Sequence, residues 1–151
     1  MVFLDVSKAF DRVYRKGLLY KLQCLGIEGN LLNWTESYLT DRYQRVVISG
    51  QTSDWASTNA GGPQGSILGP LLFLVFINDI VNDLESVPFF FADDTSLLNS
   101  FSDCNRALSI INNDRTTLAD WAAQWQFEFH AKKSTWFLVP NKTVETTLIY
   151  I

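Results

Sequence analysis

The sequence predicts an α+β domain in which a small, mainly antiparallel sheet packs on helices that lie on one side. Its 151 residues, 47% hydrophobic and 19% charged, suit one globular domain with a buried core. Short apolar runs of strand length are joined in pairs by turn signals, which favours antiparallel pairing. Between these pairs lie longer segments with helical periodicity, so helices are expected beside the strands.

The first part of the chain predicts one strand, two helices and a hairpin. The strand ends at Asp5, and Gly26 stops the first helix. The second helix carries Trp34 and Tyr38 on one face, and we expect both rings in the core. The predicted ranges are 1–5 for the strand, 16–25 and 30–39 for the helices, and 44–49 with 52–59 for the hairpin.

The second part predicts a glycine-rich loop, two more helices and further strands. We expect Ser66 to cap the first of these helices and Ser102 the second. The long second helix carries Trp121, which we expect in the core. The apolar run 67–77 is too short for a membrane span and predicts a buried helix. The predicted ranges are 60–65 for the loop, 66–82 and 103–124 for the helices, and 87–91, 95–98, 127–129 and 135–139 for the strands.

The charge and the cysteines narrow the class of protein. A net charge of −4 argues weakly against a free-standing nucleic-acid-binding protein, although local basic patches matter more than the sum. Cys24 and Cys104 have no partner at metal-ligand spacing, and no signal-peptide pattern opens the chain, so we expect reduced, buried thiols in an intracellular protein. Both ends are apolar, so we expect the chain to be cut from a larger fold. The basic clusters are Arg12 with Arg15 and Lys16, Arg42 with Arg45, and Lys132 with Lys133.

Three aspartates follow apolar runs. Asp5 ends the first strand, and Asp93 and Asp94 come shortly after three consecutive phenylalanines. Carboxylates brought together beside buried strands lose hydration and repel one another, so a positive group is needed between them. With no candidate arginine nearby, hard carboxylate oxygens favour Mg²⁺ or Mn²⁺, and such a site suits phosphoryl transfer. A solvated turn is the alternative for the aspartate pair, which the three phenylalanines disfavour.

Four segments together resemble the palm motifs of reverse transcriptases from non-LTR retrotransposons, in their family order and spacing. The phrasing between the motifs is most similar to the jockey-like branch, and the resemblance covers nearly the whole chain. The four segments are residues 2–11 (VFLDVSKAFD), 62–70 (GPQGSILGP), 91–94 (FADD) and 125–134 (WQFEFHAKKS).

The resemblance implies a catalytic role for four residues. Asp5 and Asp93 match the family's metal ligands, and Asp94 matches the aspartate that supports the site or touches a metal ion. The implied ions are Mg²⁺, with Mn²⁺ as a substitute. Lys133 matches a lysine proposed to protonate the leaving pyrophosphate, and a solvated lysine beside Lys132 is the alternative.

The resemblance also implies contacts with the nucleotide near the first motif. Phe10 stands where the family has a bulky residue under the incoming sugar, which disfavours ribonucleotides. Plain core packing is the alternative for Phe10. Ser7 and Lys8 are implied to line the triphosphate. Asp11 lies outside the family's metal set, and we expect it to cap the following helix.

The second motif and the hairpin before it are implied to meet the nucleotide and the template. Pro63, Gln64 and Gly65 lie in the loop that packs on the nucleotide and the template base in the family, with a simple glycine turn as the alternative. Arg42 and Arg45 are candidates for template phosphates. A solvated hairpin edge is the alternative for both arginines.

The resemblance implies a division of the chain and a function. Residues 1–11 and 60–140 are expected to form the palm, 12–59 an insertion belonging to the fingers, and 141–151 the start of the palm–thumb connection. The implied function is an RNA-directed DNA polymerase that uses an RNA template, a DNA primer and deoxynucleoside triphosphates. The implied protein partners are the missing fingers and thumb segments of the parent protein, and no membrane partner is implied. The alternative is an inactive, truncated remnant that acts at most as an interaction module. The family implies cytoplasmic ribonucleoprotein particles and the nucleus as locations.

Overall fold

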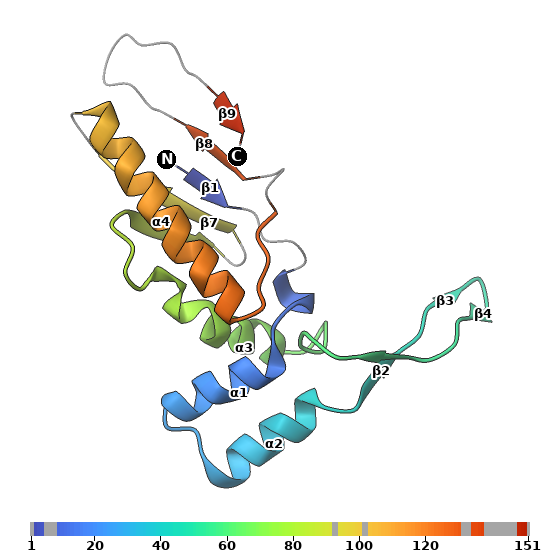
Figure 1. Ribbon diagram of the computed structural model, residues 1–151. Helices are drawn as coiled ribbons and strands as arrows, with labels where there is room; N and C mark the ends of the chain where they lie inside the picture. The colour runs from blue at the N-terminus through green and yellow to red at the C-terminus, as the bar shows by residue number, and fades with distance from the viewer. Residues whose placement is uncertain are drawn as a thin grey trace. The chain divides into compact units, whose positions relative to one another are not determined.

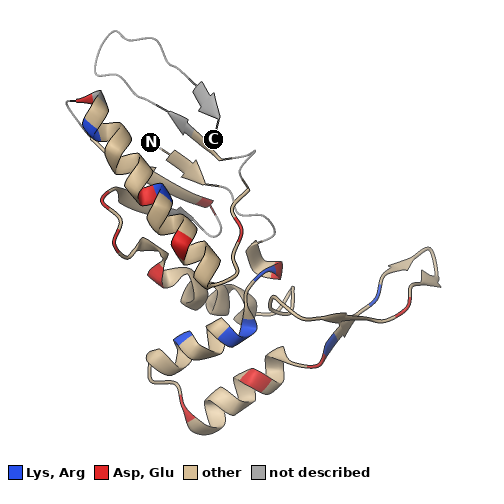
Figure 2. Cartoon of the chain, viewed as in Figure 1, with Lys and Arg blue, Asp and Glu red and all other residues tan. Residues whose placement is uncertain are grey.

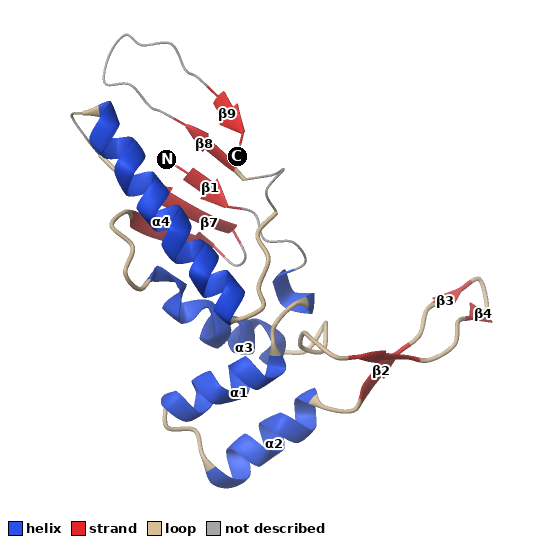
Figure 3. Cartoon of the chain, in the orientation of Figure 1, coloured by secondary structure: helices blue, strands red, loops and turns tan. Residues whose placement is uncertain are grey.

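The computed structural model describes residues 2–4, 9–91, 94–100, 103–130, 134–137 and 148–150. The chain divides into two compact units, one made of residues 1–9 and 78–151 (unit 1) and the other of residues 10–77 (unit 2). Helices and small antiparallel sheets occur together, which confirms the predicted α+β class (Figures 1 and 3). The predicted division into palm and fingers stays a prediction.

Unit 1 is built on a five-stranded antiparallel sheet with the strand order β6-β7-β1-β8-β9. The short strand β1 lies in the middle, as an apolar run with few polar residues favours. It pairs Leu4 with Thr95 on one side and Phe3 with Thr135 on the other. The strands are β1 (Val2–Leu4), β6 (Val87–Phe91), β7 (Asp94–Leu98), β8 (Thr135–Phe137) and β9 (Leu148–Tyr150). The first strand and the hairpin from residue 87 to residue 98 are thereby confirmed.

The two faces of this sheet have different surroundings. Successive side chains of a strand point to opposite faces. Val2 and Leu97 are buried on one face, and helix α4 (Cys104–Gln124) crosses that face (Figure 1). On the other face, the side chains of Phe3 and Phe89 are 41% and 51% exposed. Apolar strand residues therefore remain open on the face that α4 does not cover.

Helix α4 begins at a different cap from the one predicted. Asp103 is the N-cap, and its carboxylate accepts a hydrogen bond from the backbone N–H of Asn105 at 3.1 Å. Ser102, the expected cap, lies outside the described residues. Aspartate at this position accepts as well as serine does and adds a charge that favours the helix N-terminus. No helix in the described part of the chain has the length and apolar character to cross a membrane.

A buried carboxylate on α4 holds the start of β6. Asp114 is 2% exposed, and its two oxygens accept hydrogen bonds from the backbone N–H groups of Glu85 at 2.8 Å and Ser86 at 3.2 Å. Further along α4, the indole Nε1 of Trp121 donates to Asp79 Oδ1 at 2.9 Å. Trp121 is buried, as expected. The helix is thus bonded to both ends of the segment that precedes the hairpin.

The strand predicted over 127–129 is wrong. Only an isolated bridge residue, Phe129, has strand pairing there. Phe127 instead packs edge-to-face on Trp121, with ring centroids 5.3 Å apart, and Phe129 packs edge-to-face on Phe127 at 5.9 Å. Aromatic rings at alternate positions fit a strand pattern, but here tertiary packing of the rings decides the local conformation.

Unit 2 holds three helices, with α1 in contact with the other two. These are α1 (Arg15–Cys24), α2 (Gly29–Leu39) and α3 (Leu68–Ile77). Lys21 on α1 is buried, and its Nζ donates to the carbonyl oxygen of Phe76 at 2.6 Å. Cys24 at the end of α1 is exposed, so its expected burial is wrong. Cys24 is the last residue of its helix, and the side chain of Cys104 is not among those described.

The expected burial of Trp34 is also wrong. Helix α2 buries Thr35 and Leu39, whereas the side chain of Trp34 is 52% exposed. Trp34 precedes Thr35 by one residue and therefore lies about 100° around the helix from the buried stripe. Its ring stacks on that of Tyr38, with centroids 5.5 Å apart and planes at 13°. Tyr38 is half-buried and its hydroxyl oxygen is buried, so only Trp34 of the pair lies mainly on the helix surface.

The predicted hairpin of unit 2 forms, but it is interrupted. Strand β3 (Val47–Ile48) pairs with β4 (Gln51–Thr52), and β2 (Arg42–Gln44) pairs with β5 (Ala56–Thr58). Ser49 and Gly50 close it with φ angles of 49° and 79°, the left-handed pair that suits a two-residue turn. Between the two ladders, residues 45–46 face residues 53–55, so one strand carries an extra residue and the hairpin bends there.

Arg15 joins the base of this hairpin to α1. Its guanidinium donates to the carbonyl oxygen of Gly61 at 2.9 Å, to that of Ala60 at 3.0 Å and to Thr58 Oγ1 at 3.1 Å. Partial burial lowers the pKa of Arg15, and the positive charge of Arg42 lowers it further. A planar guanidinium with several donors is suited to holding a loop through its carbonyl groups.

Gly61 lies directly against the segment before α1. Its φ is +73°, and a Cβ there would stand 2.8 Å from the carbonyl oxygen of Phe10 and from Asp11 Cα. Its backbone N–H donates to the carbonyl oxygen of Val13 at 2.9 Å. Only glycine permits this close approach of two backbone segments.

Asp114→Ala is expected to lower the free energy of unfolding by about 2 kcal/mol, because the N–H groups of Glu85 and Ser86 lose their acceptor. Asp114→Asn is also expected to lower it, because an amide keeps only one accepting oxygen. Chemical denaturation followed by circular dichroism measures the change. Asp120→Asn is the matched control, since Asp120 is exposed on the same helix. Equal stability of the Asp114 and Asp120 variants would contradict this role.

Gly61→Ala is expected to destabilise the chain more than Gly65→Ala. Both residues have positive φ, +73° and +75°, but only Gly61 has backbone atoms where the new Cβ would be. The shared backbone penalty is about 1 kcal/mol, and the clash adds roughly 1–3 kcal/mol for Gly61 alone. Comparison of the two unfolding free energies isolates the clash, and equal values would show that the loop can move away.

Candidate functional site

The predicted site residues divide into those that the structure describes and those that it does not. Asp94, Phe10, Pro63, Gln64 and Gly65 are described. The predictions that lie outside the described residues are those for Asp5, Ser7, Lys8, Asp93 and Lys133.

Asp94 lies in the β6–β7 hairpin, at one edge of the sheet of unit 1. It is the first residue of β7, it is paired with Phe91, and its side chain is exposed. On the neighbouring strand, Leu4 is paired with Thr95, the residue after Asp94. Within the described residues, no group of three or more His, Cys, Asp or Glu side chains gathers where it could hold a metal ion.

Unit 2 contains a cavity of about 340 Å³. This volume falls within the range of small-molecule sites. The cavity is lined by Phe10, Pro63, Gln64 and Gly65, the described residues of the first and second motifs that are assigned to nucleotide or template binding. The rest of the wall is mostly apolar and comes from α1 and the segment before it, the end of α2, and α3 with the loop before it. These residues are Val13, Leu18, Leu39, Gly62, Ser66, Gly69, Pro70, Leu72 and Phe73.

Phe10 both packs in unit 2 and faces the cavity. Its ring lies 4.5 Å from that of Phe73, centroid to centroid, with the planes at 37°. Phe73 is buried, whereas Phe10 is half-buried. Core packing and a place in the cavity wall are therefore compatible for this residue, and the packing holds the ring in position.

The side chain of Gln64 forms a hydrogen bond with the side chain of Asp11. Its Nε2 donates to Asp11 Oδ1 at 2.5 Å. The helix-capping role expected for Asp11 is wrong, because the N-cap of α1 is Tyr14 and no side chain bonds there. Asp11 instead closes a 3-10 turn (Ala9–Asp11), which directs its carboxylate to the loop.

The loop passes into α3 through Ser66. The Ser66 hydroxyl accepts a hydrogen bond from the Gly69 N–H at 3.0 Å and donates to the carbonyl oxygen of Pro63 at 2.7 Å. The expected capping by Ser66 is thereby confirmed, with the helix proper beginning two residues later, at Leu68. Both functions of this hydroxyl are used within the loop.

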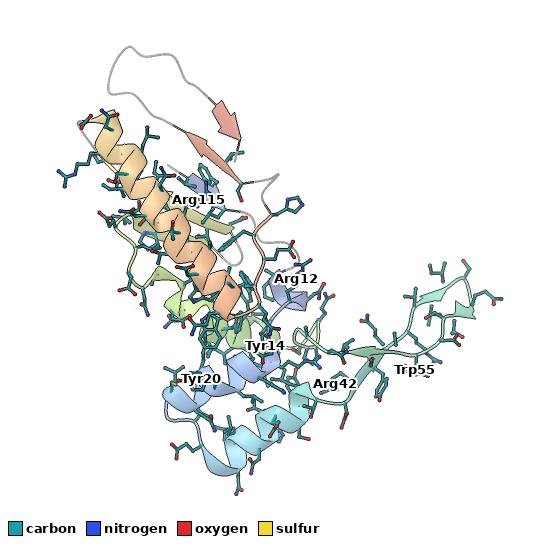
Figure 4. The ribbon with its side chains drawn as sticks, viewed as in Figure 1. Arg12, Tyr14, Tyr20, Arg42, Trp55 and Arg115 are labelled. Atoms are coloured by element: carbon teal, nitrogen blue, oxygen red, sulfur yellow. The ribbon has the colours of Figure 1, made fainter. Side chains whose placement is uncertain are left out.

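The basic residues of the hairpin lie on aromatic rings. Arg42 Nε donates to the Tyr38 carbonyl oxygen at 2.8 Å, and its guanidinium carbon is 5.0 Å from the Tyr38 ring centroid. Arg45 lies 4.6 Å from the ring centroid of Trp55. Figure 2 marks in blue the positions of lysine and arginine residues on α1 and along the hairpin, and Figure 4 labels Arg42 and Trp55. Whether Arg42 and Arg45 bind template phosphates stays a prediction.

Two functional features of unit 2 were missed from the sequence. Arg15 was grouped with a basic cluster, but its guanidinium is engaged by the loop carbonyl groups. The bond between Asp11 and Gln64 joins residues 53 positions apart. No signal in the sequence indicated the role of Arg15. For the bond between Asp11 and Gln64, the only signal was that these residues belong to the first and second motifs of the same family resemblance.

Comparison with known proteins supports this reading of the motifs. The family model described as reverse transcriptase (RNA-dependent DNA polymerase) matches residues 1–148. The chain is 35% identical over 141 residues to a probable RNA-directed DNA polymerase from transposon BS of Drosophila melanogaster, with 88% of this chain and 16% of the relative covered. It is 33% identical over 149 residues to the RNA-directed DNA polymerase from mobile element jockey of the same species, with 93% and 16% covered.

A more distant relative belongs to another element. The chain is 29% identical over 132 residues to a retrovirus-related Pol polyprotein from the type-1 retrotransposable element R2 of Popillia japonica, with 79% of this chain and 21% of the relative covered. The chain thus spans about one sixth to one fifth of the length of these curated relatives. The match over nearly all of its residues shows that the chain belongs to the reverse transcriptase family, with similarity to the polymerases of jockey and other non-LTR retrotransposons.

Proposed function

We propose that the chain is the catalytic core of an RNA-directed DNA polymerase that extends a DNA primer on an RNA template during retrotransposition. The observation that carries the proposal is that Phe10 from the first motif and Pro63, Gln64 and Gly65 from the second line one cavity of unit 2. Family membership supplies the reaction class. Deoxynucleoside triphosphates are the proposed substrates, with the remaining fingers and thumb segments of a parent protein as partners. The proposed locations are cytoplasmic ribonucleoprotein particles and the nucleus, as the family resemblance implies.

Asp5, Asp93 and Asp94 are proposed to hold the divalent ions. Support comes from the strand register, since Leu4, the chain neighbour of Asp5, is paired with Thr95, the neighbour of Asp94. Carboxylate oxygens are the ligands that Mg²⁺ prefers. When bound, the two ions supply charge that activates the primer hydroxyl and stabilises the leaving pyrophosphate.

The residues of the chain then have distinct tasks. The exposed carboxylate of Asp94 remains available to a ligand or to a metal-bound group. Phe10 sets the width of the space for the sugar, since Phe73 prevents its ring from turning away. Gln64 offers a hydrogen-bonding side chain beside that space. Lys133 is proposed to donate the proton to the leaving pyrophosphate, and Ser7 and Lys8 to line the triphosphate.

A second candidate is an inactive remnant that acts at most as an interaction module. Two departures from the family pattern favour it: Gly62 stands where the family usually has a small branched residue, and His130 stands where it usually has asparagine. A Cβ at Gly62 would meet only Gly69 Cα at 3.8 Å, so space does not require glycine there. The fold therefore does not explain the glycine at this position. The two candidates differ in whether the aspartates still bind metal ions.

Asp5→Asn and Asp93→Asn are each expected to weaken Mn²⁺ binding by at least about 10-fold, since loss of even an outer partner commonly costs that much. Electron paramagnetic resonance titration of free Mn²⁺ measures the affinity. A Mn²⁺-soaked crystal with anomalous scattering should show a peak between the two carboxylates. Asp120→Asn removes an exposed carboxylate of the same unit and is the control.

A site that Asp120→Asn weakens as much as Asp93→Asn would contradict the metal site and support the inactive remnant. Primer extension on an RNA template then decides activity. Extension by the unchanged chain, absent in the Asp93→Asn variant, is the outcome expected of a polymerase core.

Phe10→Val is expected to reduce discrimination against ribonucleotides, lowering the ratio of the Kd for ATP to the Kd for dATP by roughly 10-fold. The smaller side chain leaves room for a 2′-hydroxyl. Phe10→Tyr keeps the ring and should keep the ratio. Equilibrium binding with Ca²⁺ in place of Mg²⁺ measures both constants. An unchanged ratio in a folded Phe10→Val variant would reduce Phe10 to a packing partner of Phe73.

A further inference from the structure

We propose that Asp11 is a positioning residue, whose carboxylate holds the side-chain amide of Gln64 so that its oxygen, and not its nitrogen, is left for the ligand in the cavity. The inference rests on the proposed nucleotide-binding function and deepens it. Asp11 itself is not among the residues that line the cavity. It acts on the ligand only through Gln64.

The direction of the hydrogen bond follows from the chemistry of the two groups. An ionised carboxylate only accepts hydrogen bonds, whereas a glutamine amide has one accepting and one donating end. Gln64 must therefore turn its Nε2 to Asp11, as observed at 2.5 Å. Its Oε1 then points away from Asp11 and accepts no hydrogen bond from the described residues. A neutral partner at position 11 would not enforce this choice.

The backbones that carry the two residues are held together independently. The Gly61 N–H donates to the Val13 carbonyl oxygen at 2.9 Å, and the Gly62 N–H lies 3.4 Å from the Phe10 carbonyl oxygen. Arg15 holds the same loop through its guanidinium. Asp11 and Gln64 therefore meet without ordering a loose segment, so the amide is oriented before a ligand arrives.

The cavity offers few other polar side chains. Among its lining residues only Gln64 and Ser66 have polar side chains, and the Ser66 hydroxyl is occupied by Gly69 and Pro63. The Gln64 oxygen is thus the side-chain acceptor left to a ligand there. The part of the ligand beside it should carry a hydroxyl or amino donor, because an acceptor that a bound ligand covers without donating to it loses its hydrogen bond to water.

The test uses a double variant that exchanges the carboxylate and the amide between positions 11 and 64 and keeps the net charge of the pair. Asp11→Asn lets Gln64 flip, since an asparagine amide both donates and accepts. In the double variant Asp11→Asn with Gln64→Glu, the new amide at position 11 can donate to the new carboxylate at position 64. The other oxygen of that carboxylate can only accept a hydrogen bond from the ligand, and the net charge of the pair is unchanged. Gln64→Glu alone sets two carboxylates against each other. Asp54→Asn is the control for loss of one exposed negative charge, on the hairpin and away from the cavity lining.

Two readouts separate positioning from folding. The first is the side-chain ¹⁵NH₂ signal of Gln64 by NMR, which should show one hydrogen-bonded amide proton in the unchanged chain and lose that shift in Asp11→Asn. The second is the Kd for dATP with Ca²⁺. We expect Asp11→Asn to weaken binding by about 10-fold and the double variant to recover to within about 3-fold. Asp54→Asn should bind as the unchanged chain does.

The outcomes are distinct. Weaker binding in Asp11→Asn with recovery in the double variant supports the inference. Equal binding in the unchanged chain and Asp11→Asn overturns the inference and leaves the proposed function standing. Weaker binding without recovery, in a variant that melts at the same temperature, assigns Asp11 a purely electrostatic role and also overturns it. No dATP binding by the unchanged chain overturns the proposed function and this inference with it.

Discussion

The antiparallel pairing of β1 is the constraint on which unit 1 depends. Three residues, Val2–Leu4, join the β6–β7 hairpin on one side to β8 and β9 on the other. The register also assigns the faces, with Val2 buried near α4 and Phe3 on the open side. Because side chains alternate, a slip by one residue would exchange these faces. The pairing of so short a strand therefore determines both the strand order of the sheet and which of its faces is buried near α4.

In unit 2, one guanidinium has a comparable importance. Arg15 binds the loop that follows the hairpin, and Gly61 lets that loop lie against the segment before α1. The cavity wall is assembled where these two segments meet, with Phe10 from one and Gln64 from the other. An arginine that looks available for phosphate is thus a structural residue. The two exposed arginines of the hairpin, Arg42 and Arg45, lie instead on aromatic rings of α2 and the hairpin.

The wrong expectations share a physical cause. Trp34, Cys24 and the strand at 127–129 were all assigned from local pattern, which does not specify which neighbour will cover a side chain. Helix α2 buries a narrow stripe, so a tryptophan one residue away from Thr35 stays exposed. The rings of Phe127 and Phe129 pack edge-to-face instead of extending a strand. Propensity yields to tertiary packing in each case.

By itself the sequence determined the α+β class, nearly every helix and hairpin, and the reverse transcriptase family, because periodicity, turn residues and motif order are local or linear properties. It also nominated Phe10 and Gln64. Only the tertiary structure decided that these two share a cavity, that Arg15 is engaged by a loop, and that Asp11 holds Gln64 instead of capping a helix. Such contacts join residues some 50 positions apart, and their geometry arises only when separate segments fold against one another.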